Sequence, residues 1–374
     1  MLENQTRRSF LQNLGVGLGT TSAAFAVPSF MSVQASGTKK DEKKLGVALV
    51  GLGSYAKNQL AVGLENAKNC YLAGIVTGSP TKAEEWKKKY SIPSKNIYNY
   101  QNFDEIASNK DIDIIYVVLP NSMHREFVIR AAKAGKHVMC EKPMATSVAD
   151  AEAMIQACQA AGVQLGIGYR MHFEPFTQEI MRLGQQKILG DVRFMQTNFG
   201  FTIGDPTQWR LKKTMAGGGP LMDVGIYCVQ ASRYVTGEEP LWVTAQFGAK
   251  TDTEKFKEVE ETVSWQMQFP SGAIVNGFSS YKSNIEQLYV SCGKGHFQLS
   301  PAYSYGPIKG STSEGELKLP IVHHQTLMLE QICKEMLEKG TFPKHIDGNE
   351  GLRDMKILMA IYEAAETGKK ISLI

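Results

Sequence analysis

A glycine-rich turn between a buried strand and a helix constrains the fold of this 374-residue chain more than any other feature. The turn, Gly51-Leu52-Gly53-Ser54-Tyr55-Ala56, follows an apolar run over residues 45–50 and opens a helical pattern. That context is required of the dinucleotide-binding fingerprint G-x-G-x-x-G/A, with Ala56 in the third small position. Gly51 permits the tight turn, and Gly53 lets the backbone approach a pyrophosphate at the helix N-terminus. We therefore predict a dinucleotide cofactor, contacted by the residues of this turn: Gly51, Gly53, Ser54 and Tyr55.

Apolar strands alternate with helical patterns from Leu45 to about Gly168. The predicted strands cover residues 45–50, 71–76, 112–119, 136–140 and 163–168. The predicted helices cover residues 55–66, 81–90, 124–134 and 148–161. This alternation is typical of a doubly wound parallel sheet with crossover helices. We expect a Rossmann domain over residues 45–168.

The pattern changes after about Tyr169, where alternating stretches begin to dominate. Helices are predicted near 176–183, after Gly217-Gly218-Gly219-Pro220, and near 325–338 and 352–366. In the run 262–269, period-two alternation places four large apolar side chains on one face of a strand: Val263, Trp265, Met267 and Phe269. The turn Pro270-Ser271-Gly272 then makes a hairpin with residues 273–280. We predict an α+β domain over residues 169–374, built on an open, mainly antiparallel sheet, for substrate binding and oligomerisation.

The N-terminal segment carries the pattern of a twin-arginine export signal. Thr6-Arg7-Arg8-Ser9-Phe10-Leu11 is followed by an uncharged stretch of small and apolar residues to about Met31. Val33-Gln34-Ala35 is a small-residue cleavage site, so residues 1–35 are predicted to be removed and 36–44 to remain as a short leader. A membrane helix over 11–31 is the alternative, which the glycines, serines and threonines weaken. We expect export by the twin-arginine machinery to the periplasm or beyond, without stable membrane insertion.

Charge and cysteine usage exclude several classes of function. The formal net charge is +4, and no block of lysine or arginine suggests nucleic acid as a partner. The six cysteines show no C-x-x-C and no zinc spacing, and the seven histidines include no H-E-x-x-H. We therefore expect no metal. Most of the cysteines lie in apolar runs, so buried thiols are expected.

The residues after the second predicted strand distinguish NAD from NADP. An Asp or Glu there would bind the ribose 2′-hydroxyl of NAD. This chain instead has Val76-Thr77-Gly78-Ser79-Pro80-Thr81-Lys82, without an acid. Thr77 and Lys82 are candidates to receive a 2′-phosphate. A turn threonine and a surface lysine are the alternative, but the missing acid and the lysine agree on NADP rather than NAD.

Three further segments fall at or beyond strand ends, where an open α/β sheet places its chemistry. They are Leu119-Pro120-Asn121-Ser122-Met123-His124, Glu141-Lys142-Pro143, and Gly217-Gly218-Gly219-Pro220-Leu221-Met222-Asp223-Val224-Gly225-Ile226-Tyr227. Asp223 and Tyr227 are four residues apart on a predicted helix, hence on one face. A free tyrosine ionises near pH 10. A neighbouring ammonium such as that of Lys142 favours the ionised, basic phenol.

Together these segments resemble the glucose–fructose oxidoreductase / inositol dehydrogenase family, and within it most closely the glucose–fructose oxidoreductase branch. The resemblance runs from Gly46 to the C-terminal Ile361-Tyr362-Glu363-Ala364-Ala365. It rests on the runs over residues 138–150, 168–170, 208–211 and 221–227. It implies that the protein oxidises an aldose at C1 to a lactone with hydride transfer to bound NADP. A second sugar such as fructose is then reduced.

The resemblance also implies roles for individual residues. Lys142 and Tyr227 take part in proton transfer, and Asp223 positions the substrate or Lys142. Many relatives carry histidine where this chain has Tyr227. The substrate is expected to contact Lys142, His172, Asp223 and Tyr227. The cofactor is expected to be lined also by Tyr100, Asn121, Glu141, Lys142, Arg170, Trp209 and Arg210. A structural Lys142–Asp223 ion pair beside a packed Tyr227 is the alternative, as are a domain-closing role for either arginine and a structural role for His124 or His172.

Competing functions follow from the same residues. A nicotinamide cofactor is scarce outside the cell, so an exported enzyme must regenerate it in place, which favours the two-sugar cycle. However, only residues 36–44 lie between the predicted cleavage site and the first strand, and they contain no proline. Glucose–fructose oxidoreductases have a long proline-rich arm at this place, so the short leader leaves open whether the cofactor is retained. The alternatives are a simple NAD(P)-dependent aldose dehydrogenase, a nicotinamide-dependent glycosidase and a catalytically silent sugar-binding module. Sugar specificity is expected from loops 198–207 and 281–286. By resemblance the chain forms a homo-oligomer, a dimer or tetramer, through the second domain's sheet.

Overall fold

The computed structural model describes residues 43–374. The predicted signal peptide and residues 36–42 of the predicted leader lie outside the described residues. The first sheet has six parallel strands in the order β3-β2-β1-β4-β5-β6. Their bounds are β1 Leu45–Val50, β2 Cys70–Val76, β3 Ile97–Tyr98, β4 Ile114–Val117, β5 His137–Cys140 and β6 Leu165–Ile167. Five of them were predicted, and only the two-residue β3 was not.

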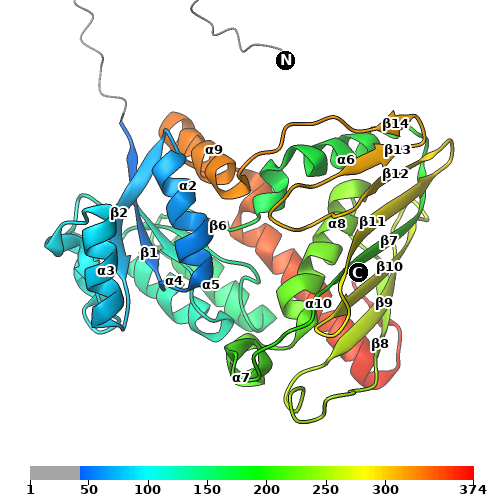
Figure 1. Cartoon of the computed structure of the whole chain (residues 1–374), viewed down its shortest axis with the longest axis horizontal. Coiled ribbons are helices and arrows are strands. Elements are labelled where there is room, and N and C mark those ends of the chain that lie inside the picture. Colours follow the sequence, from blue (N-terminus) through cyan, green and yellow to red (C-terminus); the bar gives the residue numbers. More distant parts are fainter. Residues whose placement is uncertain (1–42) are drawn as a thin grey trace, which may run out of the picture. The chain divides into compact units, whose positions relative to one another are not determined.

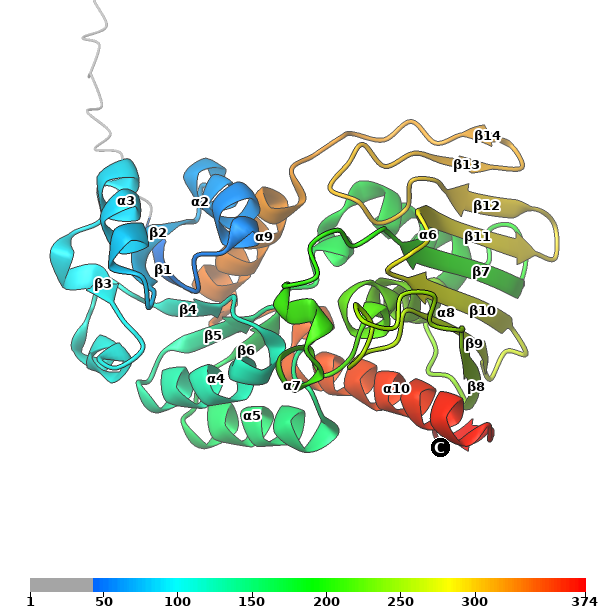
Figure 2. The ribbon, with the colours of Figure 1, turned by 60° about the horizontal axis from the view of Figure 1, so that its bottom comes forward.

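Helices cover both faces of this sheet, as the alternating pattern predicted. A π-helical turn at Ala56–Leu60 leads into α2 (Ala61–Asn66), which is followed by α3 (Pro80–Tyr90), α4 (His124–Lys133) and α5 (Val148–Ala160). Figure 2 shows α2 and α3 on one face and α4 and α5 on the other. The Ser147 hydroxyl accepts a hydrogen bond from the Asp150 amide at 3.1 Å, which caps α5 at the predicted start.

The second sheet has nine strands in the order β14-β13-β12-β11-β7-β10-β9-β8-β15. The bounds are β7 Val192–Gly200, β8 Trp242–Phe247, β9 Thr262–Gln268, β10 Ile274–Ser280, β11 Ile285–Cys292, β12 His296–Leu299, β13 Gly310–Thr312, β14 Gly315–Glu316 and β15 Ile371–Ser372. Only the β7–β10 pair is parallel, so the prediction of a mainly antiparallel sheet is confirmed. The predicted hairpin joins β9 to β10 through Gly272 at φ +87°, and the four predicted apolar side chains of this run are all buried.

Helices of the second half of the chain pack on both sheets. They are α6 (Pro175–Gln185), α7 (Lys213–Ala216), α8 (Ile226–Thr236), α9 (His324–Lys339) and α10 (Gly348–Thr367). Among the described elements, α6, α8 and α10 contact the nine-stranded sheet, and Figure 2 shows them along one of its faces. Helix α9 returns to pack beside α2, and α10 also contacts α5 and β6 (Figure 1). The first sheet ends at Ile167, close to the boundary predicted at residue 168, but helices from beyond that boundary complete its cover.

The two sheets thus form the predicted α/β fold, a Rossmann sheet followed by an α+β part with its own open sheet. No helix over residues 43–374 is long and apolar enough to cross a membrane. All six cysteines are free and buried, as predicted. The carboxyl ends of β1, β4 and β5 point toward segments of the second half, and the candidate site lies there.

Candidate active site

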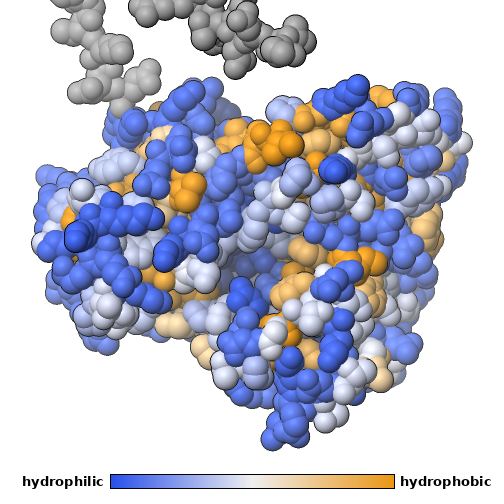
Figure 3. Space-filling view, viewed as in Figure 1, coloured by the Kyte–Doolittle hydropathy of each residue, from blue (hydrophilic) through white to orange (hydrophobic). Residues whose placement is uncertain are grey.

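A cavity of about 760 Å³ lies at the carboxyl edge of the six-stranded sheet. Its walls come from the glycine turn after β1, the residues after β2, β4 and β5, and segments around residues 205–227, 281 and 305 of the second half. Figure 3 shows a hollow between two lobes of the molecular surface, with hydrophilic residues in its depth. The cavity therefore brings the predicted cofactor turn and the predicted catalytic segments into one site.

The glycine turn fits a dinucleotide pyrophosphate. Gly51 has φ +96°, and a Cβ there would lie 2.6 Å from the Val118 carbonyl oxygen, so glycine is required for the chain itself. A Cβ at Gly53, in contrast, would meet no atom within 4 Å. The space beside Gly53 opens toward the cavity and is free for a ligand's phosphate. Ser54 and Tyr55 line the same end of the cavity.

The residues after β2 fit the phosphate of NADP. Thr77, Ser79 and Lys82 line the cavity beside the glycine turn. The Lys82 ammonium donates to the Leu52 carbonyl at 3.3 Å, which holds this cation at the turn. Among the described residues of this part of the wall there is no carboxylate. Tyr100 closes the end, with its ring against Gly78.

Side chains after β4 and β5 form the floor of the cavity. Asn121 donates to the Ala216 carbonyl at 2.8 Å and so ties the end of β4 to the second half. Glu141 is buried and accepts a hydrogen bond from the Tyr116 hydroxyl at 2.6 Å. Burial raises the pKa of the Glu141 carboxyl, although the hydrogen bond from Tyr116 and the nearby Lys142 ammonium oppose that effect. Both side chains line the cavity where the cofactor is predicted.

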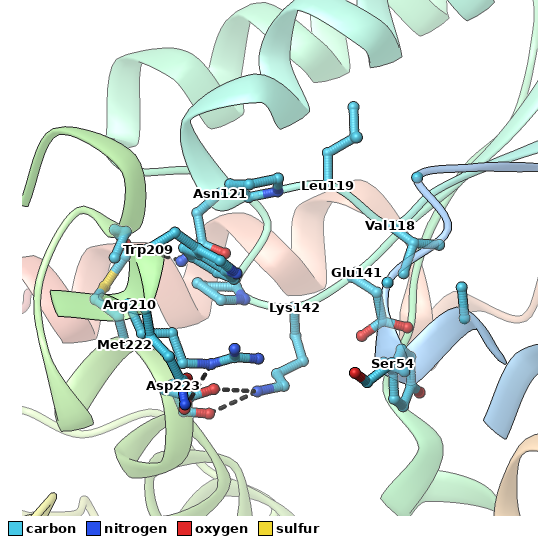
Figure 4. A pocket seen from close by; sticks show the side chains of 18 of the residues that line it. Ser54, Val118, Leu119, Asn121, Glu141, Lys142, Trp209, Arg210, Met222 and Asp223 are labelled. Atoms are coloured by element: carbon cyan, nitrogen blue, oxygen red, sulfur yellow. Dashed lines mark hydrogen bonds and ion pairs between the residues drawn. The ribbon is translucent and has the colours of Figure 1, made fainter. Parts of the chain in front are cut away.

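Four polar side chains converge at the centre of the cavity. Arg210 Nε lies 3.1 Å from Asp223 Oδ2, and the Tyr281 hydroxyl donates to the same oxygen at 3.0 Å. Lys142 Nζ lies 3.6 Å from Asp223 Oδ1 and donates to the Asp223 backbone carbonyl at 2.5 Å (Figure 4). Burial by itself would raise the pKa of Asp223, but Arg210 and Lys142 outweigh it, and the pKa of this carboxyl is lowered. Asp223 is therefore an anion that holds two cations in place.

Tyr227 completes the predicted trio. It follows Asp223 through a π-helical turn at Leu221–Gly225 that leads into α8. The Lys142 ammonium lies 4.8 Å from the centroid of the Tyr227 ring. All three side chains line the cavity. The ion pair of the structural alternative is present, but it faces a cavity instead of filling an interface.

A buried carboxylate that sequence reasoning missed holds the glycine run before Asp223. Glu260 accepts hydrogen bonds from the Gly219 amide at 2.9 Å, the Leu221 amide at 3.1 Å and the Tyr362 hydroxyl at 2.8 Å. A Cβ at Gly219 would lie 2.5 Å from the Glu260 carbonyl oxygen, which explains the glycine there. No local pattern in the sequence marks Glu260, because its partners lie about 40 and 100 residues away.

Two predicted residues lie elsewhere. His172 is buried against Tyr234 and His345, with ring centroids 3.9 and 4.6 Å apart, and does not line the cavity. This corrects its predicted contact with substrate, because the ring packs against side chains of the second half and does not reach the cavity. Arg170 is also buried and stands behind Tyr227 instead of lining the cofactor cavity. The predicted structural alternative holds for His124, which is fully buried with both ring nitrogens beside backbone carbonyls.

The cavity also contains residues that no motif marked, Asp205, Tyr281 and Tyr305. Asp205 and Tyr281 come from the two loops expected to set sugar specificity. Trp209 lines the cavity beside Arg210, and the guanidinium carbon of Arg210 lies 4.7 Å from the centroid of the Trp209 ring. Tyr305 carries no sequence signal, since it lies in an irregular loop between β12 and β13.

Comparisons with known proteins agree with this geometry. Residues 45–169 match the family model described as "Oxidoreductase family, NAD-binding Rossmann fold", and residues 177–298 match the GFO/IDH/MocA C-terminal domain. The aldose-aldose oxidoreductase of Caulobacter crescentus, solved with glycerol, is 43% identical with a TM-score of 0.85, and the alignment covers 88% of this chain and 100% of that one.

Curated relatives include the D-xylose 1-dehydrogenase [NADP(+)] of Haloarcula marismortui, 27% identical over 87% of this chain and 92% of its own. They also include the trans-1,2-dihydrobenzene-1,2-diol dehydrogenase of Xenopus laevis, 32% identical over 65% of this chain and 70% of its own. The matching domain models and the strand–glycine–helix site together confirm the predicted resemblance, and the chain belongs to the GFO/IDH/MocA family of oxidoreductases.

Proposed function

We propose that this protein is an NADP-dependent sugar oxidoreductase that oxidises an aldose at C1 to a lactone. The observation that carries the proposal is the convergence of Lys142, Asp223 and Tyr227 on the cavity that the glycine turn also lines. Such an oxidation requires a hydride acceptor and a proton acceptor at the same carbon centre. In this cavity the glycine turn would hold the nucleotide that accepts the hydride, and the Lys142–Tyr227 pair would accept the proton.

Each residue has a defined task in this reaction. The Lys142 ammonium is held by Asp223 so that it donates to the C1 hydroxyl oxygen of the sugar. Tyr227, acting as a phenolate, then accepts the hydroxyl proton and becomes a neutral phenol. Asp223, clamped by Arg210 and Tyr281, keeps the lysine from moving away. When bound, the nicotinamide ring supplies the acceptor for the C1 hydride.

NADP is favoured over NAD by this chain and by its relatives. Thr77, Ser79 and Lys82 present two hydroxyls and a cation where the 2′-phosphate would lie. The Haloarcula relative is named as an NADP(+) enzyme acting on D-xylose, and the Caulobacter structure is named as an aldose-aldose oxidoreductase. These names support a small aldose as the substrate.

The finer proposal is a two-sugar cycle in an exported protein. The predicted twin-arginine signal supports passage through that export machinery to the periplasm or beyond, where free nucleotide is scarce. After the first sugar leaves as a lactone, a ketose such as fructose or a second aldose is reduced in the same cavity. By resemblance to its family, the nine-stranded sheet, which carries the exposed Gln266 and the half-exposed Asn276, would pack against a partner subunit in a homo-oligomer, a dimer or tetramer.

The deciding experiment is an absorbance spectrum of the purified mature protein with no nucleotide added, before and after glucose. We expect a reduced-nicotinamide band that fades when fructose or a second aldose is added. A band that appears only after NADP is supplied would support the second candidate, a simple aldose dehydrogenase, which the name of the Haloarcula relative favours. No band with any aldose would refute net sugar oxidation. Free sugar released from a glycoside without a lactone would establish the glycosidase.

Lys142→Met tests the assignment of the catalytic lysine. The variant should lose turnover by a factor of about 100 or more, because the donor to the substrate oxygen is removed. Cofactor binding should persist, since the glycine turn and Lys82 are unchanged. Lys133→Met, at an exposed position on α4, is the matched control and should behave as wild type. Substantial residual turnover in Lys142→Met would remove the lysine from the mechanism.

A further inference from the structure

Arg170 is a buried cation directly behind the proposed proton acceptor. It is 3% exposed, and its Nε donates to the Tyr227 hydroxyl at 3.3 Å. Its guanidinium carbon lies 5.0 Å from the Tyr227 ring centroid and 4.6 Å from that of Tyr305. Tyr227 lines the cavity and Arg170 does not, so the arginine contacts Tyr227 from outside the cavity and a cofactor role does not explain it.

The far side of the guanidinium is held by groups that only accept hydrogen bonds here. Nη1 lies 2.6 Å from His324 Nδ1 and 3.2 Å from the Ser304 carbonyl, and Nη2 donates to the Tyr303 carbonyl. Because a guanidinium can only donate, His324 Nδ1 must be the acceptor, and the ring is neutral. Burial, assisted by Arg170, lowers the pKa of His324 to about 3, which agrees with that assignment. Arg170 is therefore fixed in place.

The charge of Arg170 is not neutralised by a carboxylate. Among the described residues no Asp or Glu lies within 4.0 Å of its guanidinium nitrogens, and its partners are carbonyls, the Met171 sulfur, a neutral imidazole, the Tyr227 hydroxyl and aromatic faces. Burial raises the pKa of Glu174 and the charge of Arg170 opposes that effect, but this carboxylate accepts its hydrogen bonds from the first turn of α6 and not from the arginine. A buried cation without an anion is costly, so a negative charge nearby is strongly favoured. An ionised Tyr227 would supply that charge.

Other groups around Tyr227 leave this effect to Arg170. Lys142 faces the ring, but its charge is shared with Asp223 at 3.6 Å, and Asp223 is in turn shared with Arg210. The remaining titratable neighbours are phenols from two other segments and from α8 itself, and the buried carboxyl beyond them: Tyr55, Tyr303, Tyr305, Tyr234 and Glu141. Burial raises the pKa of each of these groups, so they stay neutral more readily.

We propose that Arg170 is a positioning residue for proton transfer, which holds the Tyr227 oxygen and stabilises its negative charge while the sugar hydroxyl is deprotonated. The inference rests on the proposed function. In the step it serves, the C1–H bond breaks with its electron pair leaving as hydride to oxidised nicotinamide. The hydroxyl proton passes to the phenolate oxygen of Tyr227, which becomes a neutral phenol, and the C1–O bond becomes a carbonyl. Arg170 gains or loses no proton.

The test is the pH profile of kcat/KM for aldose oxidation in Arg170→Met and Arg170→Lys. Loss of an opposite charge at this distance should move the acidic limb of the profile upward by about 1 to 3 pH units in the methionine variant. Below that limb, kcat/KM should fall about 10- to 1000-fold. Arg170→Lys keeps a cation but not the Nε donor, and we expect a smaller move in the same direction. It also keeps the test open if the methionine variant does not fold.

A double-mutant cycle separates this role from a merely structural one. Tyr227→Phe should be strongly impaired, and adding Arg170→Met to it should cause little further loss, because the arginine acts through the phenol. Arg182→Met, an exposed arginine on α6, is the matched control. An unmoved acidic limb with a raised KM, or additive losses in the cycle, would overturn the proposal and leave Arg170 as an anchor of the 303–305 loop. A wild-type protein that oxidises no aldose at any pH would instead refute the proposed function.

Discussion

Alanine at Gly51 and alanine at Gly53 should have opposite consequences, although the two glycines stand two residues apart. Gly51 has φ +96°, and its Cβ would lie 2.6 Å from the Val118 carbonyl oxygen and 2.9 Å from Leu119 Cδ2. Gly53 has room for a Cβ, because no atom lies within 4 Å of that position. Gly51→Ala should therefore lower the stability of the protein, whereas Gly53→Ala should weaken only the binding of the nucleotide.

The expected magnitudes follow from those contacts. At Gly51 the left-handed backbone costs a non-glycine residue about 1–2 kcal/mol, and the backbone clash adds about 1–3 kcal/mol. Gly51→Ala should thus lower the free energy of unfolding by about 2–5 kcal/mol. Gly53→Ala should leave it within about 1 kcal/mol of wild type. A methyl group at the pyrophosphate's closest approach costs about 1–3 kcal/mol of binding, or about 5- to 150-fold in the Kd for NADP.

Urea unfolding measures the free energy of unfolding. Titration of the protein with NADPH, followed by nicotinamide fluorescence, measures the affinity for the nucleotide. The reasoning predicts a stability loss confined to Gly51→Ala and an affinity loss in Gly53→Ala without one. If Gly53→Ala binds NADPH as tightly as wild type, the cofactor does not pass over this turn. If Gly51→Ala unfolds at the same urea concentration as wild type, the strained conformation is not required.

Three further outcomes are expected. Lys82→Ala should weaken NADP binding about 10-fold while leaving NAD binding unchanged, because it removes one charge-assisted contact to a 2′-phosphate; equal losses for both nucleotides would contradict this placement. Asp223→Asn should lower the free energy of unfolding at pH 7 by about 3 kcal/mol. Because the folded-state pKa of Asp223 is lowered, its stabilisation is present above the unfolded value of about 3.9 and is lost as the pH falls through the folded value. Urea unfolding between pH 7 and 2 should therefore show the gap between wild type and variant closing in acid, and a constant gap would argue against the ion pairs. Glu260→Ala should destabilise by about 3 kcal/mol or more in the same assay, since three donors, two of them buried amides, lose their acceptor, and unchanged stability would mean that water replaces the carboxylate.

The Rossmann half was predictable because its signals are local. Strand Leu45–Val50, the turn at Gly51 and the helices after it depend on residue type and period over stretches of about ten residues. The same holds for the Glu141-Lys142-Pro143 segment, which follows a strand whose direction the parallel sheet dictates. The two-residue strand Ile97–Tyr98 escaped prediction because two residues carry no period.

In the second half the antiparallel character was predictable from alternation, but the pairing was not. Strand β10 lies parallel to β7, about 80 residues earlier, and this pairing places Tyr281 against Asp223. His172 shows the same limit at the level of one side chain. Its position in the sequence suggested the cleft, but a ring orients toward the neighbours that bury it, here Tyr234 and His345.

The sequence by itself determined the fold class and the cofactor turn, and it singled out Lys142, Asp223 and Tyr227 as candidate catalytic residues. Each of these features is marked by a short motif of residues that are neighbours in the chain. Only the tertiary structure decided what surrounds them. Arg170 is turned from a cofactor contact into the support of Tyr227 by Ser304 and His324, which lie 134 and 154 residues away. The physical reason is that hydrogen bonding and burial, which decide where a charge acts, are properties of neighbours in space.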